Sequence, residues 1–153
     1  MKFLKITFFL LLTQQLLAEK VEITSTFMEA ENAKKEVHFI GNAKVTKVDD
    51  WLHADKIIVY FDENNETKKY DALGNVSFEF KDEEKFYKGS ANKVTYHPTK
   101  SLYILTGKAV VNDLINKRNV KGDEITLDML TGKTDVKGSK KKPVKFIFDM
   151  GKS

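Results

Sequence analysis

The sequence contains no cysteine. This excludes small domains held together by disulfides and proteins anchored through a lipid-modified cysteine. The chain also lacks an apolar run of about 20 residues, the length needed to cross a membrane, because Gln14 and Gln15 interrupt the apolar stretch that starts at Ile6. A strong excess of one charge is missing too, since 26 Lys and Arg stand against 22 Asp and Glu, a net charge of +4. That balance is too mild to indicate a nucleic-acid partner.

The first 18 residues have the order of a secretory signal peptide. Lys2 and Lys5 precede an apolar run from Ile6 to Leu12, and the segment ends in Ala18. A basic start, a short apolar centre and a small residue at the end are typical of a segment removed during export. We expect cleavage after Ala18; the alternative is an uncleaved membrane anchor. The mature chain, residues 19–153, is then expected to be a single domain with a net charge of +2, since both lysines are lost.

The rest of the chain repeats with a period near 33 residues. A glycine recurs at Gly41, Gly74, Gly107 and Gly138, with spacings of 33, 33 and 31. A second element with alternating apolar residues follows each of the first three glycines, at 54–59, 91–96 and 122–127. Polar turns at 62–66, 97–100 and 130–132 lead into the next strand, and residues 23–40, turning at 32–34, form an additional half unit. Such a period predicts stacked supersecondary units.

Apolar and polar side chains alternate within each unit, as a strand with one buried face requires. Each of the first three glycines has four positions that lie two or four residues before or after it. All twelve of these positions are apolar or aromatic. They are Val37, Phe39, Ala43, Val45, Tyr70, Ala72, Val76, Phe78, Tyr103, Leu105, Ala109 and Val111. The second elements add Ile57, Val59, Val94, Tyr96, Ile125 and Leu127. No stretch of the mature chain keeps a helical stripe, so the pattern predicts an all-β domain.

The repeat glycines share the inward parity, where a missing side chain permits a sharp bend or a close approach between layers. We interpret each as a corner at which a strand passes from one sheet to the other. Repeated corners stack antiparallel hairpins into a twisted β-jelly-roll, open at both ends. The alternative is a flat meander with incidental glycines. Large and small inward residues alternate, which leaves space for a guest chain, although a packed core shows similar alternation.

The sequence shows no combination of residues typical of an active site. His38, His53 and His97 are far apart and lack metal-ligand spacing, so we expect them to be solvent-exposed polar residues. The acidic run at 62–66 lacks the glycine and the flanking helices of an EF-hand loop, and a tight polar turn explains it better. We therefore expect no enzyme, no catalytic residue, no metal and no cofactor.

The C-terminal segment combines a basic run with a short apolar strand. Lys140-Lys141-Lys142 either solvates a linker or contacts the phosphates of an anionic lipid, and a strand is predicted over 144–149. An unpaired strand at the end of a sheet can pair with another copy, unless lysines such as Lys145 and Lys152 block that edge. We expect one assembly edge at each end of the domain. The residues of these edges are Val21, Ile23, Phe146 and Phe148.

Three short motifs resemble the OstA-like family of lipopolysaccharide-transport proteins. They are Leu73-Gly74-Asn75-Val76, Ala54-Asp55-Lys56-Ile57, and Leu105-Thr106-Gly107 followed by Val110-Val111. The resemblance covers Ile23 to Phe148, almost the whole mature chain. Within the family, a short, cysteine-free domain behind a signal peptide is most similar to the periplasmic bridge members of the LptA type.

The resemblance implies an OstA-like jelly-roll in the periplasm that shields the acyl chains of lipid A and carries lipopolysaccharide from the inner to the outer membrane without catalysis. It implies an inner-membrane LptC-like partner, an outer-membrane LptD-like partner and head-to-tail self-association. Lipid would then bind the interior, at Val37, Phe39, Val45, Ile57, Val59, Tyr70, Val76, Phe78, Val94, Tyr96, Tyr103, Leu105, Val111, Ile125 and Leu127. The alternative is a secreted β-solenoid, a carbohydrate-binding module or a structural interaction module, for which Trp51 is the one candidate aromatic platform.

Overall fold

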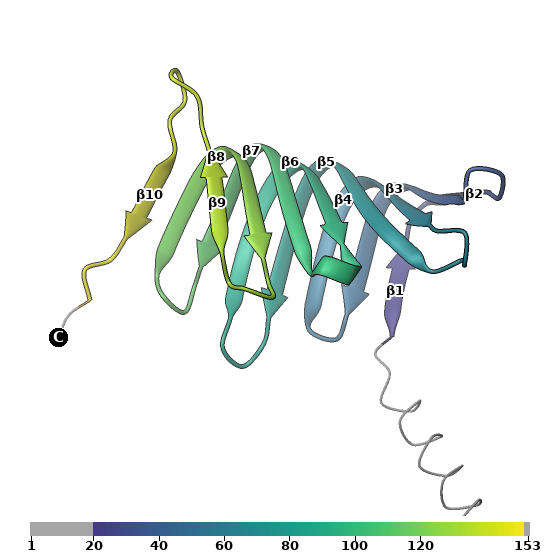
Figure 1. Ribbon diagram of the computed structural model, residues 1–153, viewed down its shortest axis with the longest axis horizontal. Coiled ribbons are helices and arrows are strands. Elements are labelled where there is room, and N and C mark those ends of the chain that lie inside the picture. The colour runs from purple at the N-terminus through teal and green to yellow at the C-terminus, as the bar shows by residue number, and fades with distance from the viewer. Residues whose placement is uncertain (1–19, 152–153) are drawn as a thin grey trace, which may run out of the picture.

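The computed structural model describes residues 20–151, so the expected signal peptide and its cleavage after Ala18 lie outside the described residues. The described residues form a 10-stranded antiparallel sheet and one turn of 3₁₀ helix, which confirms the all-β prediction (Figure 1). The elements are β1 (Val21–Thr24), β2 (Phe27–Glu31), β3 (Glu36–Lys47), β4 (Asp50–Phe61), β5 (Thr67–Lys81), β6 (Phe86–His97), η1 (Pro98–Lys100), β7 (Leu102–Asp113), β8 (Arg118–Asp128), β9 (Thr134–Lys137) and β10 (Lys145–Phe148). None of the helices within residues 20–151 has the length and apolar character needed to cross a membrane.

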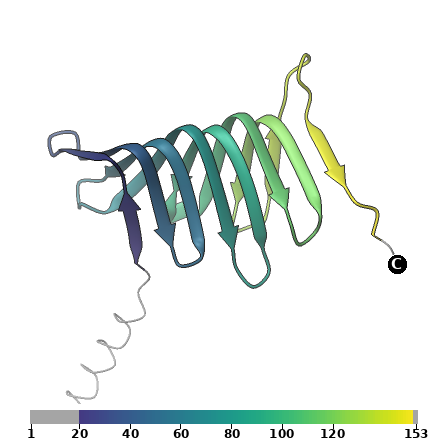
Figure 2. The same cartoon turned by 180° about the vertical axis from the view of Figure 1, so that it is seen from behind.

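The sheet folds back on itself into two layers because the long strands β3 to β8 bend near their middles. The pairing of β3 with β4 shifts register between Ile40 and Ala43, and β5 and β7 repeat this shift around Gly74 and Gly107. One half of each bent strand joins β2 and β9 in a first layer, and the other half joins β1 and β10 in a second layer. Figures 1 and 2 show the bent strands following one another along the molecule, with β1 and β2 at one end and β9 and β10 at the other.

The bends coincide with repeat glycines whose backbone conformation is unfavourable for most other residues. Gly41, Gly74 and Gly107 have φ angles of +85°, +83° and +81°, in the left-handed region that favours glycine. A Cβ at Gly74 would lie 2.5 Å from Asp55 Oδ2, and one at Gly107 would lie 2.6 Å from Asn92 Nδ2. The aspartate or asparagine of the second repeat element therefore packs against the glycine of the next unit. The corner prediction is confirmed for these three glycines.

Gly138 does not form a fourth corner, and the prediction is wrong there. β9 ends at Lys137, and the chain leaves the sheet before β10 begins at Lys145. β9 pairs with one half of β8 and β10 pairs with the other half, so two short strands replace one bent strand. Gly138 instead makes room for the connecting loop, because a Cβ there would lie 2.6 Å from the backbone N of Val144.

The cross-strand register arranges the inward residues in continuous rows. Next to the bends lie the small pairs Ala43 with Ala54, Val76 with Ala91, and Ala109 with Gly122, which let the layers approach. The next row of the first layer is Phe39, Ile57, Ala72, Val94, Leu105, Ile125 and Val136. Farther from the bends it presents Val37, Val59, Tyr70, Tyr96, Tyr103 and Leu127. The main row of the second layer is Val45, Leu52, Phe78, Gly89, Val111, Val120 and Phe146.

The hairpin between β7 and β8 is closed by Asp113, a buried carboxylate. Arg118 and Asn116 donate side-chain hydrogen bonds to Asp113 Oδ2 at 2.7 and 2.9 Å. Burial alone would raise the pKa of Asp113, but the hydrogen bonds from Arg118 and Asn116 outweigh it and hold the pKa below its ordinary value. The ionised carboxylate therefore stabilises this turn.

Asp113→Ala is expected to lower the free energy of unfolding by about 1.5–3 kcal/mol near neutral pH, the range for a hydrogen bond to a charged group. Folding lowers the pKa of Asp113. Its contribution to the free energy of unfolding is therefore complete at pH values above the unfolded-state pKa near 4, and it is lost as the pH falls through the folded-state pKa. Urea unfolding at several pH values measures this, and the difference from wild type should shrink below about pH 4. Asp135→Ala, which removes an exposed carboxylate 3.8 Å from Lys133, is the control; a pH-independent loss in Asp113→Ala would contradict the assignment.

Candidate functional site

The two layers diverge away from the bends and enclose an apolar cavity of about 240 Å³. Its apolar wall comprises Val21, Val45, Trp51, Leu52, Ile57, Tyr70, Ala72, Phe80, Val94, Tyr96 and Tyr103. All of these belong to β1 and to β3 through β7. The cavity therefore lies toward the end formed by β1 and β2, which we call the N-terminal end; β9 and β10 form the C-terminal end.

The predicted interior residues all lie in the inward rows, so the sequence parity is confirmed. Nine are buried: Ile57, Val59, Val76, Phe78, Val94, Leu105, Val111, Ile125 and Leu127. Six are half-buried: Val37, Phe39, Val45, Tyr70, Tyr96 and Tyr103. The half-buried residues belong to β3 or to the halves of β5, β6 and β7 nearest the first-layer turns. Their contact with lipid stays a prediction.

Charged residues border the cavity at the turns of the second layer. Lys47 and Asp50 lie at its edge, and Lys81 and Lys85 help to line an adjoining cavity of about 140 Å³. Burial raises the pKa of Asp50, although its Oδ1 accepts a hydrogen bond from the backbone N of Lys81 at 2.7 Å. The site is thus amphipathic, with an apolar wall beneath a rim that carries both lysines and aspartates, Asp50 and Asp82.

Five aromatic rings in contact with one another, which we call the aromatic ladder, cross the interior between the layers. The ring centroids of Tyr70 and Tyr96 are 5.9 Å apart, and those of Tyr96 and Tyr103 are 4.3 Å apart. From the second layer, Phe80 contacts Tyr103 at 4.6 Å and stacks on Phe78 at 4.7 Å. Burial raises the pKa of Tyr103, with a further contribution from Tyr96, so the Tyr103 hydroxyl keeps its proton. The Tyr103 ring at the centre of the ladder is therefore uncharged.

The sequence prediction missed several interior residues, among them Leu52, Phe80 and Gly89. Leu52 lies two residues before Ala54, and Phe80 lies two residues after Phe78, so both have the inward parity. Extending the alternation by one step would have identified them. Gly89 lies opposite Phe78 on β6, where a Cβ would come within 2.3 Å of Phe78 Cζ. No repeat signal marks Gly89, because its role depends on the neighbouring strand.

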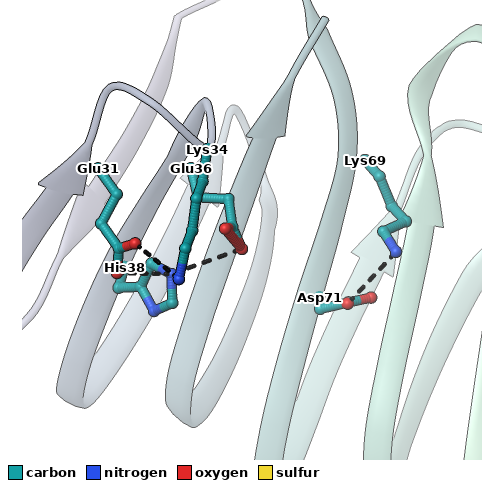
Figure 3. A network of polar contacts seen from close by, with 6 residues as sticks. All are labelled: Glu31, Lys34, Glu36, His38, Lys69 and Asp71. Atoms are coloured by element: carbon teal, nitrogen blue, oxygen red, sulfur yellow. Dashed lines mark ion pairs between the residues drawn. The ribbon is translucent and has the colours of Figure 1, made fainter.

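The prediction that His38 is solvent-exposed is wrong. Its side chain is 14% exposed, and its Nε2 lies 3.7 Å from Glu36 Oε1 and 4.0 Å from Glu31 Oε1 on the outer face of the first layer (Figure 3). His53 and His97 are half-buried. The side chains of adjacent strands cover part of this outer face, which alternation along a single strand does not reveal.

The acidic run at 62–66 forms a tight turn, as predicted. Asp62 Oδ1 accepts hydrogen bonds from the backbone N of Asn64 and of Glu66 at 2.8 and 3.0 Å. Within the part of the chain that the structure describes, no group of three His, Cys, Asp or Glu side chains is placed to hold a metal ion. The Asp62 carboxylate organises its own turn.

Trp51, the candidate carbohydrate platform, is half-buried on β4. Its Nε1–H donates a hydrogen bond to Glu79 Oε2 at 2.8 Å, and Lys44 Nζ lies 5.8 Å from the ring centroid. An indole ring held between an acid and a lysine does not offer a bare aromatic surface. The structure therefore gives no support to the carbohydrate-binding alternative.

Comparison with known proteins agrees with this geometry. Residues 22–133 match the model of a family described as "LptA/(LptD N-terminal domain) LPS transport protein". A similar solved structure is that of LptH, the LptA homologous periplasmic component of the lipopolysaccharide transport device from Pseudomonas aeruginosa, with a TM-score of 0.75 and 14% identity, covering 86% of this chain and 96% of that chain. No curated protein matches the sequence. Since the family model spans most of the sequence, this chain belongs to the family of LptA and LptD N-terminal domain lipopolysaccharide-transport proteins.

Proposed function

We propose that this chain is a periplasmic carrier that binds lipopolysaccharide and passes it from the inner to the outer membrane, without catalysing a reaction. The observation that carries the proposal is an apolar cavity between two β-layers, with Lys47 and Asp50 at its edge, in a member of a lipopolysaccharide-transport family. LptH, which shares the fold, is described as a periplasmic component of a lipopolysaccharide transport device. Both supports point to the same ligand class.

The chemistry of the cavity suits an anionic lipid. Moving acyl chains from water into an apolar interior is favourable by about 25 cal/mol per Å² of buried surface. Val45 and Leu52, half-buried in the second layer, offer such surface at the N-terminal end. Lys47 at the rim places an ammonium group where phosphate groups of the lipid would remain in water. Binding would then need no change in the covalent structure of the lipid.

We also propose that residues 1–18 are removed on export and that residues 19–153 act as one domain. The basic, apolar and small-residue order of the first 18 residues supports removal. The continuous sheet from β1 to β10 supports a single unit. The lipid would reach this domain from an LptC-like partner and leave it toward an LptD-like partner.

Head-to-tail association of copies would extend the carrier into a bridge. β1 and β10 are the edge strands of the second layer, which contains eight strands. Strand direction alternates through this even number, so β10 of one copy and β1 of the next would run antiparallel and could exchange backbone hydrogen bonds. Ile23 and Phe146 occupy the two ends of one inward row, since they pair with Val45 and Val120. The inward row would continue across the junction.

The decisive test compares two adjacent residues of β3 with the same charge change. Val45 faces inward and Thr46 faces outward, and both are half-buried. Val45→Glu should weaken binding of lipopolysaccharide by at least about tenfold, because a charge in an apolar site costs more than the 1.4 kcal/mol that a factor of ten requires. Thr46→Glu should bind as wild type. Binding is measured by displacement of a fluorescent acyl probe, after circular dichroism shows that both variants are folded; equal binding by folded Val45→Glu would contradict the proposed site.

A further inference from the structure

The cavity does not extend through the whole interior. It lies among β1 and β3 to β7, where Val45 on β3 is half-buried. No described residue of β8, β9 or β10 lines it, and Leu105 and Ile125, which continue the first-layer row from Val94, have no exposed surface. The inward rows continue through both regions, so the difference is one of packing and not of sequence pattern.

The aromatic ladder separates these two regions. Tyr96, Tyr103 and Phe80 line the cavity. On the side of β8, Tyr103 pairs with Leu127 and its neighbour Leu105 pairs with Ile125, and all three aliphatic residues are buried. Because Phe80 comes from the second layer and Tyr103 from the first, their contact at 4.6 Å bridges the space through which a chain would pass. The ladder is the wall at which the cavity ends.

We infer that Tyr96, Tyr103 and Phe80 form an internal partition that confines acyl chains to the N-terminal half of the interior until the rings move aside. The inference rests on the proposed function. The cavity of about 240 Å³ is smaller than the roughly 300–1,000 Å³ typical of sites for drug-sized ligands. It therefore has room for part of one acyl chain, and a lipid with several chains, or its passage to β10, requires displacement of the partition.

Two tryptophan reporters on opposite sides of the ladder test this directly. The sequence has a single tryptophan, so Trp51→Phe provides a background without tryptophan fluorescence and keeps an aromatic ring at this position of the cavity wall. Leu52→Trp places a reporter in the cavity wall, and Val120→Trp places one beyond the ladder in the same inward row; both positions are half-buried. The probe is a long-chain fatty acid brominated near its methyl end, which quenches tryptophan on contact. Ser90→Trp, at an exposed outward position, measures quenching by free probe.

With the ladder intact, the probe should strongly quench the tryptophan fluorescence of the Leu52→Trp variant. It should quench the fluorescence of Val120→Trp no more than that of Ser90→Trp. Adding Tyr103→Ala should bring quenching at Val120→Trp to at least half of that at Leu52→Trp. Phe80→Leu is the second way to open the ladder, and Phe146→Trp, at an exposed position paired with Val120, is the second far reporter if Val120→Trp does not fold.

The outcomes separate the partition from the carrier function. Equal quenching of both reporters with the ladder intact would overturn the partition and leave the carrier function standing. A far reporter that stays unquenched after both Tyr103→Ala and Phe80→Leu would also overturn it. Failure to quench Leu52→Trp above the Ser90→Trp level would contradict the proposed function itself.

Discussion

Gly89→Ala is expected to destabilise the protein by about 3 kcal/mol or more, at the upper end of the range for overpacked sites. The added Cβ would lie 2.3 Å from Phe78 Cζ and 2.4 Å from the backbone O of Val110. Phe78 is 1% exposed and stacks on Phe80, so its ring has little room to retreat, and the carbonyl belongs to a paired strand. Relief would require the layers or the β6–β7 pairing to separate.

Two other glycines serve as controls, because they separate crowding from backbone strain. Gly132 has a φ of +75° but nothing within 4 Å of an added Cβ, so Gly132→Ala should cost only about 1 kcal/mol of left-handed strain. Gly74→Ala combines a φ of +83° with a clash against the Asp55 carboxylate, an exposed side chain that can rotate, and should be intermediate. Urea unfolding followed by circular dichroism gives all three values. A cost for Gly89→Ala no larger than that for Gly132→Ala would show that Phe78 does not need this space.

Removing residues 144–153 is expected to abolish the proposed head-to-tail association of residues 19–153. The deletion takes away β10, whose Phe146 and Phe148 are about half exposed, at 51% and 53%, and stack on each other at 5.3 Å. At the opposite end, Val21 of β1 is 46% exposed. Exposed apolar side chains on an unpaired edge favour strand addition, and the proposed contact would join two different surfaces and so extend without closing. Light scattering across a concentration series measures the loss.

Engineered cysteines define the register of the same contact. The chain has no cysteine of its own, so an introduced pair has no competing thiol. Antiparallel continuation of the inward row pairs Phe146 with Ile23, and a mixture of Phe146→Cys and Ile23→Cys proteins should form a disulfide-linked dimer on oxidation. A mixture of Ile147→Cys with Ile23→Cys, one residue out of register on the opposite face, is the control and should form much less dimer.

Disulfides that join Phe146→Cys to itself would indicate a two-fold symmetric contact and contradict the bridge. Retained association after deletion of 144–153 would contradict the role of β10. If wild-type protein stays monomeric at high concentration, the alternative holds, and lysines such as Lys145 keep the edge unpaired.

The inward face and the corners could be predicted from the sequence because both depend on local geometry. Alternation along a strand is a property of its own backbone, so Val37, Ile57 and Ile125 could be assigned to the interior without knowledge of their partners. A left-handed corner restricts residue type strongly, so Gly41 and Gly74 marked the bends. Gly138 shares their spacing but not their environment, because the chain leaves the sheet there instead of bending within it.

What only the tertiary structure decided is how those faces meet. Parity places Phe80 and Tyr103 on inner surfaces, but their contact across the layers depends on the register of β5 against β6 and β7. The sequence by itself determined that this chain is a bent, two-layered β-structure with an apolar interior, since strand period and glycine conformation are local. The cavity at the N-terminal end and the ladder that closes it arise from packing between residues that are distant in sequence. Such packing depends on which side chains become neighbours in three dimensions, and the repeat along the chain does not encode those neighbours.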